Sequence, residues 1–155
     1  MTQNKIRILF VCHGNICRSP MAEFVLKDLV NKAGLDHVFI IDSAATSTEE
    51  IGNDIHSGTR TILKREGIPF SKRAARQITV ADYDKYDFLV GMDEENLYYM
   101  NRRWNQDPKG KIKLLMEFTG IRRAIEDPWY TGNFNQVYLD IREGCEAIVR
   151  EVLQN

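Results

Sequence analysis

Short apolar runs alternate along this chain with longer segments in which apolar residues recur at helical spacing. The runs predict strands at 5–11, 38–41, 88–90 and 112–115. The periodic segments predict helices at 20–33, 57–66, 94–104 and 134–153, and residues 82–87 read as a turn. Strands that alternate with helices are typical of an α/β fold built around a parallel sheet.

The length and composition limit the classes of protein to consider. A chain of 155 residues with 43% hydrophobic and 28% charged residues is expected to form one domain, spanning residues 1–155. The formal net charge is −1, so no overall basic field predicts binding to nucleic acid or to an anionic membrane. No apolar run approaches the roughly 20 residues needed to cross a bilayer. The first residues show no signal-peptide pattern, and we expect a cytoplasmic protein.

The three cysteines, Cys12, Cys17 and Cys145, form no C-x-x-C pair, and no His-rich cluster accompanies them. This pattern argues against a disulfide scaffold and against a zinc site. Cys145 falls on the apolar face of the last predicted helix, where we expect it to pack in the core.

The segment VCHGNICRSP joins the first predicted strand to the first predicted helix. It places Cys12 and Arg18, separated by five residues, on a strand-to-helix loop. Backbone N–H groups of such a loop bind anions together with the helix N-terminus behind them. A guanidinium grips phosphate oxygens in pairs, and a thiol in this electropositive place should ionise readily. The loop therefore predicts a phosphate cradle with a nucleophile at its floor, at the carboxyl end of a strand, where α/β sheets bind ligands.

An ordinary structural role is the alternative for this loop. A cysteine after a buried strand is more often a small hydrophobic residue, and C-x5-R alone is a weak signal. The neighbouring residues favour catalysis. Gly14 permits a positive φ or a close backbone approach, and Asn15 tolerates the left-handed region. We expect Ser19 to cap the following helix, with Pro20 at its first position.

Together with the segment DPWY at 127–130, the loop at 12–19 resembles the low-molecular-weight protein tyrosine phosphatase family. Further matches are DSA at 42–44, ARQ at 75–77, YD at 86–87 and MD at 92–93. The resemblance covers nearly the whole chain. It implies a four-stranded parallel sheet flanked by helices, which is flavodoxin-like and phosphotyrosine phosphatase I-like. It also implies hydrolysis of phosphotyrosine in protein substrates and of aryl phosphates, with no metal and no cofactor.

The resemblance assigns the chemical roles by position. Cys12 matches the nucleophile, which would carry a phosphocysteine intermediate. Arg18 matches the arginine that clamps phosphate. Asp127 matches the general acid, which would protonate the leaving phenolate and then act as base for water. The residues implied to hold phosphate, or an oxyanion inhibitor, are His13, Gly14, Asn15, Ile16, Cys17 and Ser19.

The resemblance also implies supporting residues. Ser19 would hydrogen-bond the thiolate, while Asn15 and Ser43 would brace the loop. Trp129 and Tyr130 would form the wall of the entrance and stack on an aryl group.

Two residues carry an alternative interpretation of their own. An Asp-Pro pair commonly opens a turn, which is the simpler role for Asp127. Asp107-Pro108 is the other Asp-Pro pair in the chain. The Lys-Gly that follows it indicates a plain turn. Cys17 resembles a thiol that in some members forms a reversible disulfide with the nucleophile under peroxide. The alternative for Cys17 is an inert buried cysteine.

The chain departs from the family pattern at three positions, one of which is Thr131, where some members have a second tyrosine that can be phosphorylated. Glu49 stands where many members carry an aromatic residue, so one wall of the aryl slot is replaced by negative charge, unless this loop is simply solvated. Arg73 stands where some members carry a histidine that braces the cysteine loop.

Three other functions compete with hydrolysis of phosphotyrosine. Arsenate reductases that resemble this fold need further cysteines, and none lies between Cys17 and Cys145. A non-catalytic phosphate-binding module would lack the nucleophile, the clamp or the acid. Phosphoarginine is a further candidate substrate. Ile16 and the wall formed by Trp129 and Tyr130 favour an aryl group, whereas the negative charge of Glu49 leaves the guanidinium of phosphoarginine as an alternative. We expect a monomer with at most weak self-association.

Overall fold

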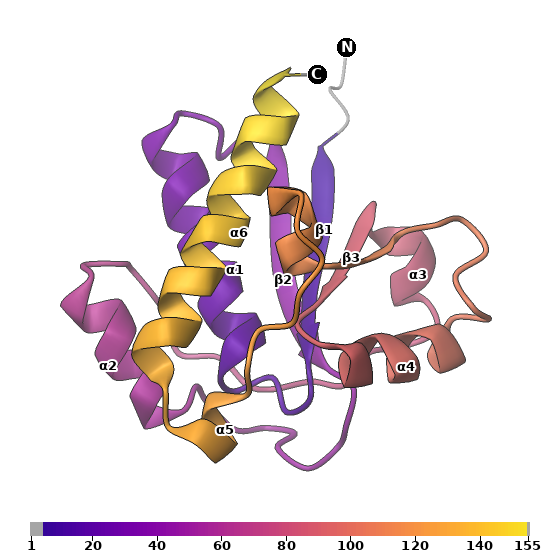
Figure 1. Cartoon of the computed structure of the whole chain (residues 1–155), viewed down its shortest axis with the longest axis horizontal. Coiled ribbons are helices and arrows are strands. Elements are labelled where there is room, and N and C mark those ends of the chain that lie inside the picture. The colour runs from indigo at the N-terminus through magenta and orange to yellow at the C-terminus, as the bar shows by residue number, and fades with distance from the viewer. Residues whose placement is uncertain (1–4, 155) are drawn as a thin grey trace.

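The structure is a computed structural model that describes residues 5–154. One parallel sheet contains β1 (Ile6–Cys12), β2 (Phe39–Ala45), β3 (Phe88–Gly91) and β4 (Ile112–Leu114), in the order β2-β1-β3-β4. The helices are α1 (Arg18–Lys32), α2 (Ser57–Arg65), α3 (Asp82–Lys85), α4 (Glu94–Arg103), the 3-10 helix η1 (Leu115–Thr119), α5 (Pro128–Thr131) and α6 (Phe134–Gln154). The predicted four-stranded parallel sheet flanked by helices is confirmed (Figure 1).

Strand β1 lies at the centre of the sheet because its alternate residues supply both cores. Ile8 and Phe10 belong to the core that also contains residues of α1 and α6. Leu9 and Val11 belong to the core on the opposite face, which contains residues of α4. All four side chains are fully buried, as expected for a parallel strand covered on both sides.

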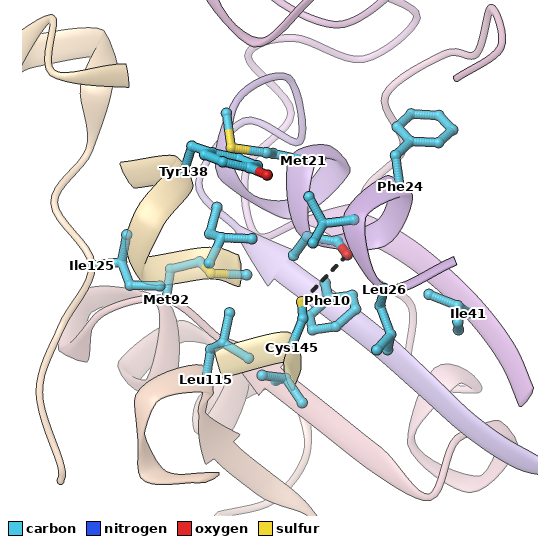
Figure 2. Packing of buried hydrophobic residues seen from close by; sticks show 14 of the residues in the cluster. Phe10, Met21, Phe24, Leu26, Ile41, Met92, Leu115, Ile125, Tyr138 and Cys145 are labelled. Atoms are coloured by element: carbon cyan, nitrogen blue, oxygen red, sulfur yellow. Dashed lines mark hydrogen bonds between the residues drawn. The ribbon is translucent and has the colours of Figure 1, made fainter. Parts of the chain in front are cut away.

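Figure 2 shows the core between the sheet, α1 and α6. Met21 and Leu26 of α1 pack there with Phe10 of β1 and Tyr138 of α6. Cys145 is fully buried in this cluster, and its Sγ lies 3.7 Å from the backbone oxygen of Ala22. Cys145 is therefore a core residue, as the helical spacing predicts.

Several element boundaries differ from the predicted ones. Strand β2 continues to Ala45 because its pairing with β1 extends as far as Cys12. Residues 82–85 form the short helix α3 rather than a turn. The prediction that Ser19 caps the first helix is wrong: α1 begins at Arg18, and its N-cap, Cys17, makes no side-chain capping bond. None of the helices in the described part of the chain is long and apolar enough to cross a membrane.

Candidate active site

The loop between β1 and α1, residues 12–19, is called the phosphate loop below. Within residues 5–154, the backbone N–H groups of residues 13–18 donate to no protein acceptor. Asn15 adopts the left-handed conformation, with φ 59°. Gly14 is not left-handed; a side chain there would come within 3.3 Å of Glu50. Free donors on a tight loop at a helix N-terminus are the arrangement that binds phosphate.

Cys12 ends β1 at the base of the loop, where its side chain is nearly buried. Its Sγ lies 3.1 Å from Ser19 Oγ and accepts the Ser19 backbone N–H at 3.4 Å. Once Cys12 is ionised, the Ser19 hydroxyl can act only as the donor in this pair. The Ser19 hydroxyl thus hydrogen-bonds the Cys12 sulfur and does not cap the N-terminus of α1.

Asn15 connects the phosphate loop to strand β2, through Ser43, and to the segment that carries Arg73. Its Nδ2 donates to Ser19 Oγ at 2.8 Å and to Ser43 Oγ at 2.9 Å. Its Oδ1 accepts from Arg73 Nη2 at 2.5 Å, and Ser43 in turn donates to Glu23 Oε1 at 2.6 Å. The residues expected to brace the loop are therefore in contact with it, and Arg73 occupies the bracing position through its guanidinium.

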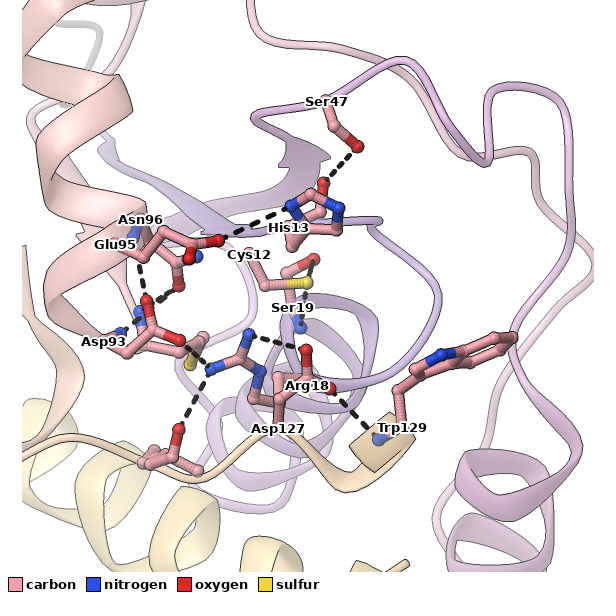
Figure 3. A network of polar contacts seen from close by, with 12 residues as sticks. Cys12, His13, Arg18, Ser19, Ser47, Asp93, Glu95, Asn96, Asp127 and Trp129 are labelled. Atoms are coloured by element: carbon pink, nitrogen blue, oxygen red, sulfur yellow. Dashed lines mark hydrogen bonds and ion pairs between the residues drawn. The ribbon is translucent and has the colours of Figure 1, made fainter. Parts of the chain in front are cut away.

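Arg18 lies behind the loop with 1% of its surface exposed. Its Nη1 donates to Asp93 Oδ2 at 2.7 Å and to the backbone oxygen of Ile125 at 2.9 Å, and its Nη2 lies 3.4 Å from Asp127 Oδ2 (Figure 3). Burial alone would lower the pKa of Arg18, but the negative charges of Cys12, Asp93 and Asp127 outweigh burial and raise it. The guanidinium is held as a cation in a fixed orientation.

Asp93 is a site residue to which the sequence patterns assigned no role; among them it appears only in the MD pair at 92–93 that matches the family. Its Oδ1 accepts the Asn96 N–H at 2.8 Å and caps α4, while Oδ2 binds Arg18. A double role of this kind leaves no separate sequence signal, because the capping pattern fully accounts for the aspartate.

Asp127 approaches the loop from a segment more than a hundred residues later in the chain. It caps the short helix α5, with Pro128 in the first turn, and its Oδ1 accepts the Trp129 N–H at 3.0 Å. The other carboxylate oxygen faces Arg18. Asp107, the other Asp-Pro aspartate, instead accepts from the Tyr83 hydroxyl at 2.6 Å and belongs to a structural turn.

A pocket above the phosphate loop brings together most of the predicted site residues, but Asn15 and Ser19, which were also expected to hold phosphate, do not line it. It is lined by Cys12, His13, Gly14, Ile16, Cys17, Arg18, Glu49, Glu50, Asp127, Trp129 and Tyr130. Trp129 and Tyr130 are 56% and 81% exposed. Both rings are therefore available at the entrance to stack on a flat group.

Glu49 is part of this entrance and is held there by the phosphate loop itself. His13 Nε2 lies 2.5 Å from Glu49 Oε2, and His13 Nδ1 lies 3.8 Å from Glu95 Oε1. The Glu49 side chain is 68% exposed, so it also faces solvent. The entrance thus has an aromatic side and an acidic side.

Cys17 is buried and lines the same pocket. Burial, together with the negative charge of Cys12, raises the pKa of the Cys17 thiol to about 12. Cys17 therefore stays protonated at neutral pH. In the described part of the chain, no group of three or more His, Cys, Asp or Glu residues is arranged to hold a metal ion.

Comparisons with known proteins agree with this geometry. Residues 7–155 match the family described as low molecular weight phosphotyrosine protein phosphatase. The chain is 41% identical over 149 residues to the low molecular weight protein-tyrosine-phosphatase YfkJ of Bacillus subtilis, covering 95% of this chain and 96% of that protein. It is 42% identical over 149 residues to the human low molecular weight phosphotyrosine protein phosphatase, covering 93% and 94% of the two chains.

Solved structures show the same likeness. The crystal structure of YfkJ superimposes with a TM-score of 0.94 at 39% identity, covering 99% of this chain and 98% of that one. A Drosophila arginine phosphatase superimposes with a TM-score of 0.84 at 34% identity, covering 95% and 98%. The fold is thus shared with proteins named for two different phosphorylated residues.

Proposed function

Because the chain belongs to the low molecular weight phosphotyrosine protein phosphatase family and is a protein tyrosine phosphatase, we propose that Cys12, Arg18 and Asp127 carry out its reaction. The observation that supports this assignment is the meeting of the three side chains at one pocket. Arg18 Nη2 and Asp127 Oδ2 lie 3.4 Å apart, beside the loop that starts with Cys12.

In the first step, the Cys12 thiolate attacks the phosphorus of phosphotyrosine. The Sγ–P bond forms while the bond between phosphorus and the tyrosine oxygen breaks, and Asp127 gives its proton to that oxygen. The free N–H groups of residues 13–18 and the Arg18 guanidinium hold the equatorial oxygens as negative charge develops on them. The product is phosphocysteine and a neutral tyrosine side chain.

In the second step, the Asp127 carboxylate takes a proton from water as the water oxygen attacks phosphocysteine. The Sγ–P bond breaks, phosphate leaves, and Cys12 returns as the thiolate, which the Ser19 hydroxyl stabilises from 3.1 Å. Inorganic phosphate and other oxyanions fit the same loop and act as competitive inhibitors.

The entrance supports phosphotyrosine as the substrate. Trp129 and Tyr130 offer exposed rings for the aryl group, and Ile16 adds an apolar lining. The Glu49 carboxylate beside His13 favours substrates with a basic residue next to the phosphotyrosine, because opposite charges attract across the pocket rim.

Phosphoarginine is the second candidate substrate. The observation that favours it is the pair of carboxylates, Glu49 and Glu50, in the pocket lining, since a guanidinium next to phosphate carries positive charge that they would attract. The fold likeness to a Drosophila arginine phosphatase is compatible with this chemistry.

The proposal includes a redox response at the same pocket. Peroxide would oxidise the Cys12 thiolate to a sulfenic acid and be reduced to water. Attack by the Cys17 sulfur on the Cys12 sulfenic acid then forms a disulfide, and the sulfenic hydroxyl leaves with the Cys17 thiol proton as water. Two molecules of a small thiol reduce this disulfide back to the two cysteines and are themselves oxidised to a disulfide. The location of Cys17 in the lining of the Cys12 pocket supports this step.

The test is hydrolysis of p-nitrophenyl phosphate at mildly acid pH with a chelator present. We expect wild type to be active, Cys12→Ser to be inactive, and Asp127→Ala and Asp127→Asn to lose about a hundred-fold or more in kcat. Phosphotyrosine and phosphoarginine peptides, compared by kcat/KM, then rank the two substrates. Reduced, folded wild-type protein without activity on any of these phosphates would overturn the proposed function.

A further inference from the structure

His56 lies where the phosphate loop and the general-acid segment approach each other. Its backbone N–H donates to the backbone oxygen of Ile16 in the phosphate loop at 2.8 Å. Its Nδ1 accepts the Gly58 N–H at 2.9 Å and caps α2. Its ring stacks on Phe134, with centroids 5.2 Å apart, and meets Trp129 edge-on at 5.6 Å.

These contacts fix the position of the imidazole from several directions. A backbone N–H can only donate, so Nδ1 is the unprotonated nitrogen of the ring. Gly58 has no side chain where the Phe134 ring lies: a Cβ on Gly58 would come within 2.4 Å of Phe134 Cζ. Phe134 also packs against Ile16 and Cys17 of the phosphate loop. The imidazole is therefore held between the start of α2 and the start of α6, directly beside the phosphate loop.

The segment that carries Asp127 is anchored on its upstream side by Ile125. The Ile125 N–H donates to the Met92 backbone oxygen at 2.8 Å, and its own oxygen accepts from Arg18 at 2.9 Å. On the downstream side, the Asp127 carboxylate depends on Trp129, whose N–H donates to Oδ1 at 3.0 Å. A shift of the Trp129 backbone therefore disturbs the hydrogen bond that holds one of the two carboxylate oxygens.

The Trp129 ring is more than half exposed and meets the His56 imidazole. From these contacts we infer that His56 is a positioning residue for the general acid. The His56 ring fixes the position of Trp129 relative to the phosphate loop. The Trp129 N–H in turn fixes the position of the Asp127 carboxylate. The inference rests on the proposed function, in which Asp127 protonates the leaving oxygen.

A misplaced acid affects leaving-group protonation more than phosphate binding. Phenolate is a poorer leaving group than p-nitrophenolate, so hydrolysis of phenyl phosphate is more sensitive to a misplaced acid than hydrolysis of p-nitrophenyl phosphate. His56→Asn separates the two roles of His56, because asparagine still caps a helix through its side-chain oxygen but has no ring. We expect kcat/KM for phenyl phosphate to fall about ten-fold and that for p-nitrophenyl phosphate to fall about two-fold or less. The inhibition constant of inorganic phosphate should stay within about two-fold.

Three further variants make the test specific. His37→Asn alters an exposed histidine between α1 and β2 and should leave the ratio of the two kcat/KM values unchanged. His56→Phe keeps a ring but loses the capping nitrogen, so it should lower the melting temperature while largely preserving that ratio. In the Asp127→Asn background, His56→Asn should cause little further loss, because both changes remove the same proton transfer.

Two outcomes would overturn the inference alone. In the first, wild type is active but His56→Asn leaves the ratio of the two kcat/KM values unchanged. In the second, the loss in the double variant equals the product of the losses in His56→Asn and Asp127→Asn. Wild-type protein inactive on both phosphates would instead overturn the proposed function and, with it, the premise of the inference.

Discussion

Arg73 holds the left-handed residue of the phosphate loop: its Nη2 lies 2.5 Å from both the backbone oxygen and the side-chain oxygen of Asn15. Asn15 is fully buried, and its amide in turn donates to Ser19 and Ser43. Burial lowers the pKa of Arg73, opposed by the charges of Glu23 among others. A guanidinium therefore braces the loop at the position where the family resemblance implies a histidine in some members.

Removal of this guanidinium should loosen the loop. Arg73→Ala leaves two oxygens of buried Asn15 without their charged donor, so we expect the free energy of unfolding to fall by about 1–3 kcal/mol. We also expect phosphate to bind more weakly, because the free N–H groups lose their fixed directions. Urea unfolding and phosphate inhibition measure both effects.

Lys72→Ala is the matched control, since Lys72 is the exposed neighbour of Arg73 in sequence. It should change stability by less than about 0.5 kcal/mol. Equal effects of the two substitutions would contradict a bracing role for Arg73.

The acidic side of the entrance should select substrates by charge. Glu49→Gln removes the charge that His13 holds at the rim. We expect the preference for phosphotyrosine peptides with lysine over glutamate next to the phosphotyrosine to fall about two- to five-fold, the range typical of an exposed charge pair. The kcat/KM ratio of the two peptides is the measurement, and the wild-type preference should shrink in high salt.

Asp36→Asn serves as the control for this charge effect, because Asp36 is exposed near the start of β2, at the opposite end of the sheet from Cys12. The rim hypothesis fails if Asp36→Asn lowers the peptide preference as much as Glu49→Gln does.

The thiols of the phosphate loop should differ in reactivity. The thiolate is the form that reacts with iodoacetamide, and the pKa of Cys17 is raised to about 12. At pH 8 only about one Cys17 in ten thousand would be ionised, and this fraction rises as the pH approaches 12. We expect mass spectrometry at pH 7–8 to find Cys12 alkylated first, with loss of activity and protection by phosphate. Alkylation of Cys17 before Cys12 would contradict the assignment of the nucleophile.

Gly58 should tolerate no side chain while Phe134 keeps its ring. Gly58→Ala places a methyl group within 2.4 Å of Phe134 Cζ, so we expect the free energy of unfolding to fall by about 1–3 kcal/mol. Ser57→Ala, at the exposed neighbouring position of α2, should change it by less than about 0.5 kcal/mol. In a Phe134→Leu background, Gly58→Ala should lower the free energy of unfolding by less than it does with Phe134 present. An equal loss in that background would show that the Phe134 ring does not clash with the added methyl group.

Local sequence alone predicted much of the site. The strand-loop-helix segment around Cys12 and the tolerance of Asn15 for the left-handed conformation were predicted from sequence and are seen in the structure. Each depends on interactions between residues a few positions apart, such as alternation and turn chemistry. The family resemblance extended this to the pairing of Cys12 with Asp127.

Contacts between distant segments were decided by the tertiary structure. Ser19 has the pattern of a helix cap, yet its hydroxyl contacts Cys12 because the loop turns it toward the sulfur. The residues next to His56 in the sequence form no motif that assigns it a role. Its contacts with Trp129 and Phe134 form only where α2, α6 and the Asp127 segment pack together. The sequence by itself determined that four strands alternate with longer helices, and where each of them lies to within a few residues, since this follows from short-range periodicity. Only packing of the elements determined which side chains meet, because such contacts join residues tens of positions apart.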